Sequence, residues 1–153
     1  AGAHLVSLLT ADPSIAERAG AAPWLGTVAL DSAAFNVVTI MEAPHLPLYD
    51  PIFGTDPDLW RDSSPTLRLT GAPAPMLLVC DSERATSCGQ ASAFEAQVAG
   101  QYGKSAADDI QVYPVDLRHG DINSALGTPI PLTDTVDAFL QSLAPKIAGP
   151  SNG

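Results

Sequence analysis

Three short apolar runs, each bounded by turn-forming residues, constrain the fold of this chain more than any other feature. They are GTVALD (26–31), PAPMLLVC (73–80) and DIQVYPV (109–115). Nearly continuous apolar runs of this length are typical of strands that are buried on both faces of a parallel sheet. Because helical patterns separate the runs, we expect an α/β fold in which parallel strands alternate with helices in a three-layer sandwich.

The rest of the chain divides into predicted helices and one long irregular segment. Residues 45–75 are rich in Pro, Asp and Gly and contain one short predicted helix near DPDLW (56–60), and residues 116–123 are predicted to form a loop. Helices are predicted over 2–11, 15–20, 32–43, 91–103 and 132–144. Three strands are few for a self-sufficient sheet. We therefore expect residues 1–148 to be the C-terminal part of one larger α/β domain, with 42–72 as a cap or pocket excursion and 149–153 as a disordered tail.

The charge of the chain restricts its expected partners, and its cysteine content bears on the cellular compartment. The chain carries 17 acidic against 7 basic residues, a net charge of −10, which disfavours nucleic acid and anionic lipid as partners. No apolar run is long enough to cross a membrane. Cys80 and Cys88 match no zinc spacing and form either a disulfide or two free thiols, so the compartment stays open between cytoplasmic and exported. No pattern indicates a metal or another cofactor.

One histidine has the position of a catalytic base. His119 follows the third predicted strand, at the carboxyl edge of the sheet where open α/β proteins place their ligands, and Gly120 leaves the turn free. A histidine base needs a carboxylate that holds its tautomer and a nucleophile that it deprotonates. Asp31 closes the first predicted strand, and Asp81 follows the second with Glu83 two residues further on. The carboxylate is one of these three.

No nucleophile is convincing within the chain, and the other histidines are interpreted as structural. None of the serines follows a strand in a G-x-S-x-G turn; those considered are Ser32, Ser82, Ser87 and Ser92. His4 and His45 lack metal-ligand spacing to a second ligand.

The ordered set of segments resembles the C-terminal half of the α/β-hydrolase serine carboxylesterases. AGAHL (1–5) looks like the end of GHSAGAHL, the nucleophile elbow of that family, directly after its serine. VALD (28–31), PMLLV (75–79) and DLRHGDIN (116–123) follow in the family's order. FGTDPDLWRDSSP (53–65) is similar to a segment of the branch related to kynurenine formamidases and feruloyl-esterase-like hydrolases. The resemblance covers essentially the whole chain.

The resemblance implies an ester hydrolase that works through an acyl-enzyme. The nucleophile serine would directly precede Ala1, whose backbone N–H would form half of the oxyanion hole, and His119 would be the catalytic histidine. At the position where most relatives carry the acid, this chain has Arg84. Asp31 is therefore slightly favoured as the acid over Asp81 and Glu83.

The same resemblance implies the partners. They are a small-molecule ester and the N-terminal half of the same domain, which would supply the serine and the missing strands. The expected substrate-pocket residues are Phe35, Met41, Leu46 and Tyr49. Two alternatives stay open: an amide hydrolase such as an arylformamidase with the same residues, and a non-catalytic α/β binding domain.

Overall fold

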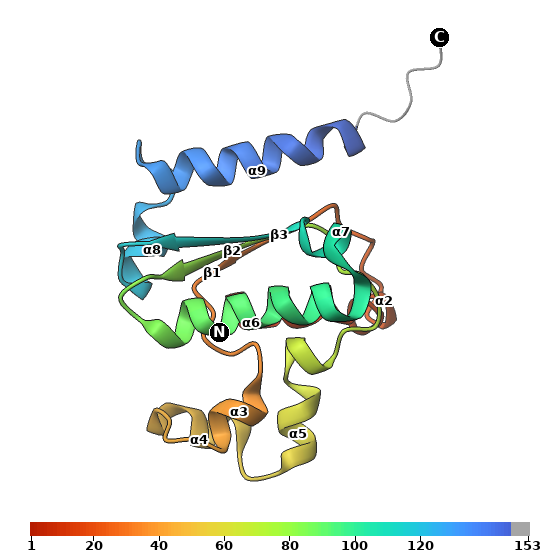
Figure 1. Cartoon of the computed structure of the whole chain (residues 1–153), viewed down its shortest axis with the longest axis vertical. Helices are drawn as coiled ribbons and strands as arrows, with labels where there is room; N and C mark the ends of the chain where they lie inside the picture. The colour runs from red at the N-terminus through yellow and green to blue at the C-terminus, as the bar shows by residue number, and fades with distance from the viewer. Residues whose placement is uncertain (148–153) are drawn as a thin grey trace.

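Three parallel strands form the middle layer of the molecule (Figure 1). The computed structural model describes the backbone of residues 1–147 and the side chains of residues 1–143. Its strands are β1 (Thr27–Leu30), β2 (Met76–Asp81) and β3 (Ile110–Val115), in the order β1-β2-β3. Leu30 pairs with Val79, and Asp81 pairs with Val115, so the carboxyl ends of all three strands meet at one edge.

Helices cover both faces of the sheet. In Figure 1, α9 (Pro131–Ile147) lies on one side, and α6 (Ala85–Tyr102) lies on the other. Successive residues of a strand point to opposite faces. Met76 and Leu78 of β2 accordingly pack in one cluster with Phe94 of α6, whereas Leu77 and Val79 pack in another with Phe139 of α9. All six residues of β2 are buried, as expected for a central parallel strand.

Helix α1 (Gly2–Ala11) also covers the sheet, on the same side as α6, and it contacts β1. Its residue Ala11 belongs to the same buried cluster as Phe94. The short helices α2 (Ser14–Arg18) and α7 (Lys104–Ala107) complete the connections to β1 and β3. The amino-terminal end of α1 lies near the carboxyl edge of the sheet, where Ala1 and Gly2 line a cavity together with Leu30 at the end of β1.

The segment between β1 and β2 forms a small helical subassembly with its own core. Its elements are α3 (Val37–Met41), η1 (Pro47–Tyr49), α4 (Asp50–Phe53), α5 (Pro57–Asp62) and η2 (Pro65–Leu67). They lie beyond α6 as seen from the sheet (Figure 1). The buried members of this core are Ala34, Val37, Ile40, Met41 and Phe53.

The α/β class, the three strands and the helix over 2–11 are confirmed. The predicted helix over 32–43 is wrong for its first part, because only Val37–Met41 is helical. There the N–H groups of Phe35 and Asn36 donate to the side chain of Gln90, and the Asn36 side chain caps the helix. Such a long-range contact overrides a local helical pattern.

Two other boundaries differ between the sequence-based prediction and the structure. The loop predicted over 116–123 is wrong in its second half, since α8 (His119–Ala125) begins at the histidine. Helix α6 begins six residues before the predicted start at residue 91. The tail predicted over 149–153, and residue 148, lie outside the described residues. None of the helices within residues 1–147 is both long and apolar enough to span a membrane.

Candidate functional site

His119 and Asp31 form a hydrogen-bonded pair at the carboxyl edge of the sheet. The Nδ1 atom of His119, the first residue of α8, lies 2.7 Å from Oδ2 of Asp31, which directly follows β1. The Asp31 side chain is fully buried, whereas that of His119 is 56% exposed. One end of the imidazole is thus anchored and the other faces solvent.

Asp31 is held by three further donors. The N–H of Asp81 donates to its Oδ1 at 2.9 Å, the Ser87 hydroxyl donates to the same oxygen, and the Arg84 guanidinium pairs with Oδ2. Burial by itself would raise the pKa of Asp31. The hydrogen bonds from Ser87, Asp81 and His119 and the charge of Arg84 outweigh burial and keep the pKa below its ordinary value. Asp31 is therefore ionised at neutral pH.

The backbone at Asp31 adopts an uncommon conformation. Its φ is +59°, and it has the only positive φ of a residue other than glycine within residues 1–147. Asp is among the few residue types that tolerate this left-handed region. The turn at the end of β1 places the carboxylate where donors from β2, α6 and α8 converge on it. Backbone strain of this kind clusters at functional sites.

The pairing sets the tautomer of a neutral His119. An ionised carboxylate can only accept, so Nδ1 of His119 must carry the proton that it donates to Asp31. In the neutral ring, Nε2 then carries the lone pair. No described residue hydrogen-bonds to Nε2. This nitrogen is free to take a proton from a bound group.

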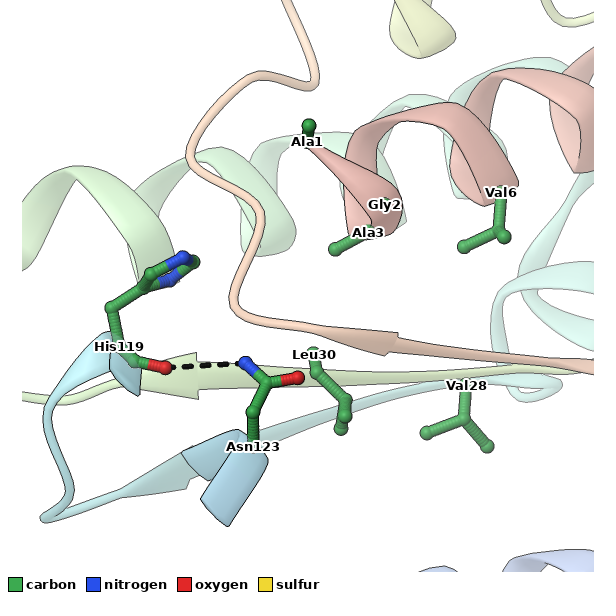
Figure 2. A pocket seen from close by; sticks show the side chains of 8 residues that line it. All are labelled: Ala1, Gly2, Ala3, Val6, Val28, Leu30, His119 and Asn123. Carbon is green, nitrogen blue, oxygen red and sulfur yellow. Dashed lines mark hydrogen bonds between the residues drawn. The ribbon is translucent and has the colours of Figure 1, made fainter. Parts of the chain in front are cut away.

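A cavity of about 300 Å³ brings His119 next to the amino-terminal end of α1. In Figure 2 the imidazole extends from the sheet edge toward the side on which Ala1 lies. The lining residues are Ala1, Gly2, Ala3, Val6, Val28, Leu30, His119 and Asn123. Helix α1 has no side-chain cap. Its first N–H groups, which have no partner within the helix, are suited to stabilise negative charge.

Asp81 and Glu83 do not reach the histidine. The Asp81 carboxylate accepts from the N–H of Glu83 at 2.9 Å, which closes a tight turn after β2. Asp81 contributes to the site through its backbone, because its N–H holds Asp31. Of the three candidate carboxylates, Asp31 is the one that hydrogen-bonds to His119.

The residues expected to form the substrate pocket separate into two groups. Phe35 is 1% exposed and packs on Phe94 at a ring-centroid distance of 5.2 Å, and Met41 is buried in the small helical core. These two are core residues, because Phe35 packs in the cluster of Phe94 and Met41 in that of Phe53. Leu46 and Tyr49 do line a cavity, and Arg84 lines the same cavity. That cavity does not include His119.

The two cysteines form a disulfide between Cys80 of β2 and Cys88 of α6. It ties the first turn of α6 to the sheet beside the residues that hold Asp31. Cys80 is fully buried. The alternative of two free thiols does not apply to this structure.

The other histidines have structural contacts, as interpreted from the sequence. His4 lies 2.7 Å from the carbonyl oxygen of Ser63 through Nε2, and its ring packs edge-on against Phe53. Burial lowers the pKa of His4, against the opposing effect of that hydrogen bond. His45 lies between the carbonyl oxygen of Ala43 and the carboxylate of Asp50. Among the side chains of residues 1–143, no group of three potential metal ligands comes together.

Sequence reasoning missed Arg84 and Ser87 as partners of Asp31. Arg84 had one signal, since it occupies the position at which the resembled family carries its acid. Ser87 had none. Both contacts join residues more than fifty positions apart.

No family model, no curated protein and no solved structure matches the chain.

Proposed function

We propose that this chain forms the histidine-bearing part of a serine hydrolase of carboxylic esters, whose nucleophile is the residue that precedes Ala1 in the full polypeptide. The observation that carries the proposal is the Asp31–His119 pair, with Nε2 of His119 free beside the amino-terminal end of α1. A residue placed immediately before Ala1 would lie close to that nitrogen and to the uncapped N–H groups of α1. The sequence resemblance to the esterase elbow supports a serine there.

The chemistry follows from this placement. The serine oxygen attacks the ester carbonyl carbon while Nε2 of His119 takes the hydroxyl proton. The ionised Asp31 stabilises the imidazolium and holds its orientation. The carbonyl then re-forms as the bond between the acyl carbon and the alcohol oxygen breaks, and His119 gives its proton to the departing alcohol. Water repeats the same two steps on the acyl-enzyme and releases the acid.

The amino-terminal end of α1 supplies the oxyanion donors. The negative charge of the tetrahedral intermediate would lie against the N–H of Ala1, in the position that the resembled family uses. One such donor contributes on the order of 3 kcal/mol to the lowering of the barrier. The rest of the oxyanion hole would come from the N-terminal half of the domain.

The open edge of β1 supports the presence of an N-terminal half of the domain. Among the described strands, β1 pairs only with β2. An apolar hollow of about 290 Å³ lies beside it, lined by Val6, Leu9, Trp24 and Val28 among others. A further parallel strand that leads into α1 would cover this hollow and satisfy the open edge of the sheet.

The test is turnover by the full-length polypeptide. Hydrolysis of p-nitrophenyl acetate should fall about 10⁴-fold or more in His119→Ala. His4→Gln replaces a histidine outside the cavity and should retain activity. Undiminished turnover in His119→Ala would contradict the proposal. Faster cleavage of an N-formyl anilide than of the matched formate ester would favour the amide-hydrolase alternative, and no turnover of either would favour a binding domain.

A further inference from the structure

A second cavity, which we call the Arg84 cavity, lies between the 39–49 segment and the first turns of α6. Its volume is about 460 Å³. Ile40, Leu46 and Tyr49 contribute apolar surface, and Arg84, His45 and Thr86 contribute polar groups. It is therefore amphipathic, with an apolar wall and a small number of polar groups, as is usual for small-molecule sites.

The charges that line this cavity are of the opposite sign to the chain as a whole. The protein carries a net charge of −10, yet no Asp or Glu lines the Arg84 cavity. The two basic side chains at its wall are Arg84 and His45. An anion would find fewer like charges here than over most of the surface.

The surroundings of His45 favour its protonated form. Its Nδ1 lies 2.7 Å from the carbonyl oxygen of Ala43, and its Nε2 lies 3.0 Å from a carboxylate oxygen of Asp50. Both neighbours can only accept, so they favour the form in which both ring nitrogens carry protons. Asp50 and the Ala43 carbonyl accordingly raise the pKa of His45. Asp50 itself does not line the cavity.

Arg84 has donor capacity that the protein does not use. Its Nη2 donates to the carboxylate and carbonyl oxygens of Asp31. Its Nη1 has no hydrogen-bond partner among the side chains and backbone of the described residues, and its Nε is buried without one. A guanidinium with a free nitrogen at a cavity wall suits a carboxylate ligand.

We propose that the Arg84 cavity binds the carboxylate of an amphipathic small molecule, with Arg84 pairing to the carboxylate and Leu46 and Tyr49 contacting its apolar body. Arg84 donates to Asp31, and Asp31 accepts from His119, so the cavity adjoins the catalytic pair. As a substrate subsite it rests on the proposed function, and its occupant is then an ester that carries a free carboxylate. As a ligand site it stands independently of catalysis.

Equilibrium binding tests the site without any requirement for turnover. Calorimetric titration of the full-length protein with 4-phenylbutyrate and with its neutral amide, 4-phenylbutyramide, compares ligands of nearly equal shape. The acid should bind about tenfold more tightly at low ionic strength, because a charge-assisted hydrogen bond is lost with the amide. Added NaCl should reduce the difference. Equal affinities, or binding of neither compound, would overturn the proposal.

A matched pair of variants at Leu46 tests whether the acid binds in the Arg84 cavity. Leu46 is 52% exposed, so Leu46→Glu and Leu46→Gln should both fold. The Glu variant should bind the acid at least about fivefold more weakly than the Gln variant, since only Glu adds a repelling charge. Both variants should bind the amide equally. Identical acid affinities in the two variants would place the acid elsewhere and overturn the proposal. Loss of esterase activity in the His119→Ala protein with retained acid binding would separate this site from the catalytic claim.

Discussion

The carboxylate of Asp31 and the imidazole of His119 meet at 2.7 Å although the two residues are 88 positions apart in the chain. The contact requires that β1, β2 and β3 are parallel and in register, because Asp31 follows β1 and His119 follows β3. Three other donors converge on the same carboxylate. A buried carboxylate with four donors is fixed in orientation and can fix the histidine in turn.

Asp31→Asn should reduce kcat for ester hydrolysis by about 10⁴-fold, because an amide no longer enforces the His119 tautomer with its proton on Nδ1. Asp81→Asn is the matched control: the Asp81 side chain accepts only from the N–H of Glu83, and the backbone donor to Asp31 is kept. We expect it to retain kcat within a few-fold. Steady-state kinetics on p-nitrophenyl acetate measures both, and the reverse ranking would assign the acid to Asp81.

The ion pair between Asp12 and Arg68 should be a stabilising contact. Asp12 is 1% exposed and also accepts from Ser14 at 2.6 Å. Asp12→Asn should lower the free energy of unfolding by about 2 kcal/mol, because the partly buried Arg68 loses its buried partner and keeps only the exposed Asp62. Asp62 pairs with the same Arg68 from an exposed position, so Asp62→Asn should cost less than about 1 kcal/mol. Urea unfolding compares the two variants, and equal losses would contradict the assignment.

The free energy of unfolding should decrease at acidic pH, because the buried carboxylate of Asp12 becomes protonated. The hydrogen bond from Ser14 and the pairing with Arg68 outweigh burial and lower the pKa of Asp12 below 3.8. A carboxylate with a lowered folded-state pKa stabilises the fold above its unfolded value and loses that contribution as pH falls through the folded value. The free energy of unfolding should therefore decline below about pH 4. Asp12→Asn should show a shallower decline, and an unchanged slope would exclude Asp12 as a source.

Reduction of the Cys80–Cys88 disulfide should destabilise the protein. The bridge closes a short loop with a sequence separation of 8, for which chain entropy gives about 2.5 kcal/mol. Thermal unfolding with and without dithiothreitol should show a lower Tm in the reduced wild type. The Cys80→Ala/Cys88→Ala variant should be insensitive to the reductant. A wild-type Tm that does not respond to full reduction would contradict this contribution.

The strands and most helices could be predicted because their patterns are local. Continuous apolar runs such as MLLVC identify a buried parallel strand without knowledge of its neighbours. The irregular stretch at 32–36 could not be predicted, since the N–H groups of Phe35 and Asn36 donate to Gln90, more than fifty residues away. The same limit left Asp31 only slightly favoured over Asp81 and Glu83 as the candidate acid. The φ of +59° at Asp31 and the direction of its side chain depend on the assembled sheet edge.

The residues predicted to line the substrate pocket show the same limit of sequence-based prediction. Phe35 and Leu46 are both apolar and lie in the same segment between β1 and β2, yet the first is 1% exposed and the second 52%. Composition cannot separate a core residue from a cavity wall, because that depends on which chain segment covers it. Arg84 illustrates the opposite case, in which a departure from a familiar pattern marked a residue that contacts the site.

Covalent labelling of the full-length polypeptide tests the central claim most directly. An alkyl fluorophosphonate should add one adduct to the wild-type protein, and peptide mass spectrometry should place it on the residue that precedes Ala1. His119→Ala should label far more slowly, because nothing then takes the hydroxyl proton. Absence of an adduct on the wild-type protein, an adduct at another residue, or an equal labelling rate in His119→Ala would contradict the account.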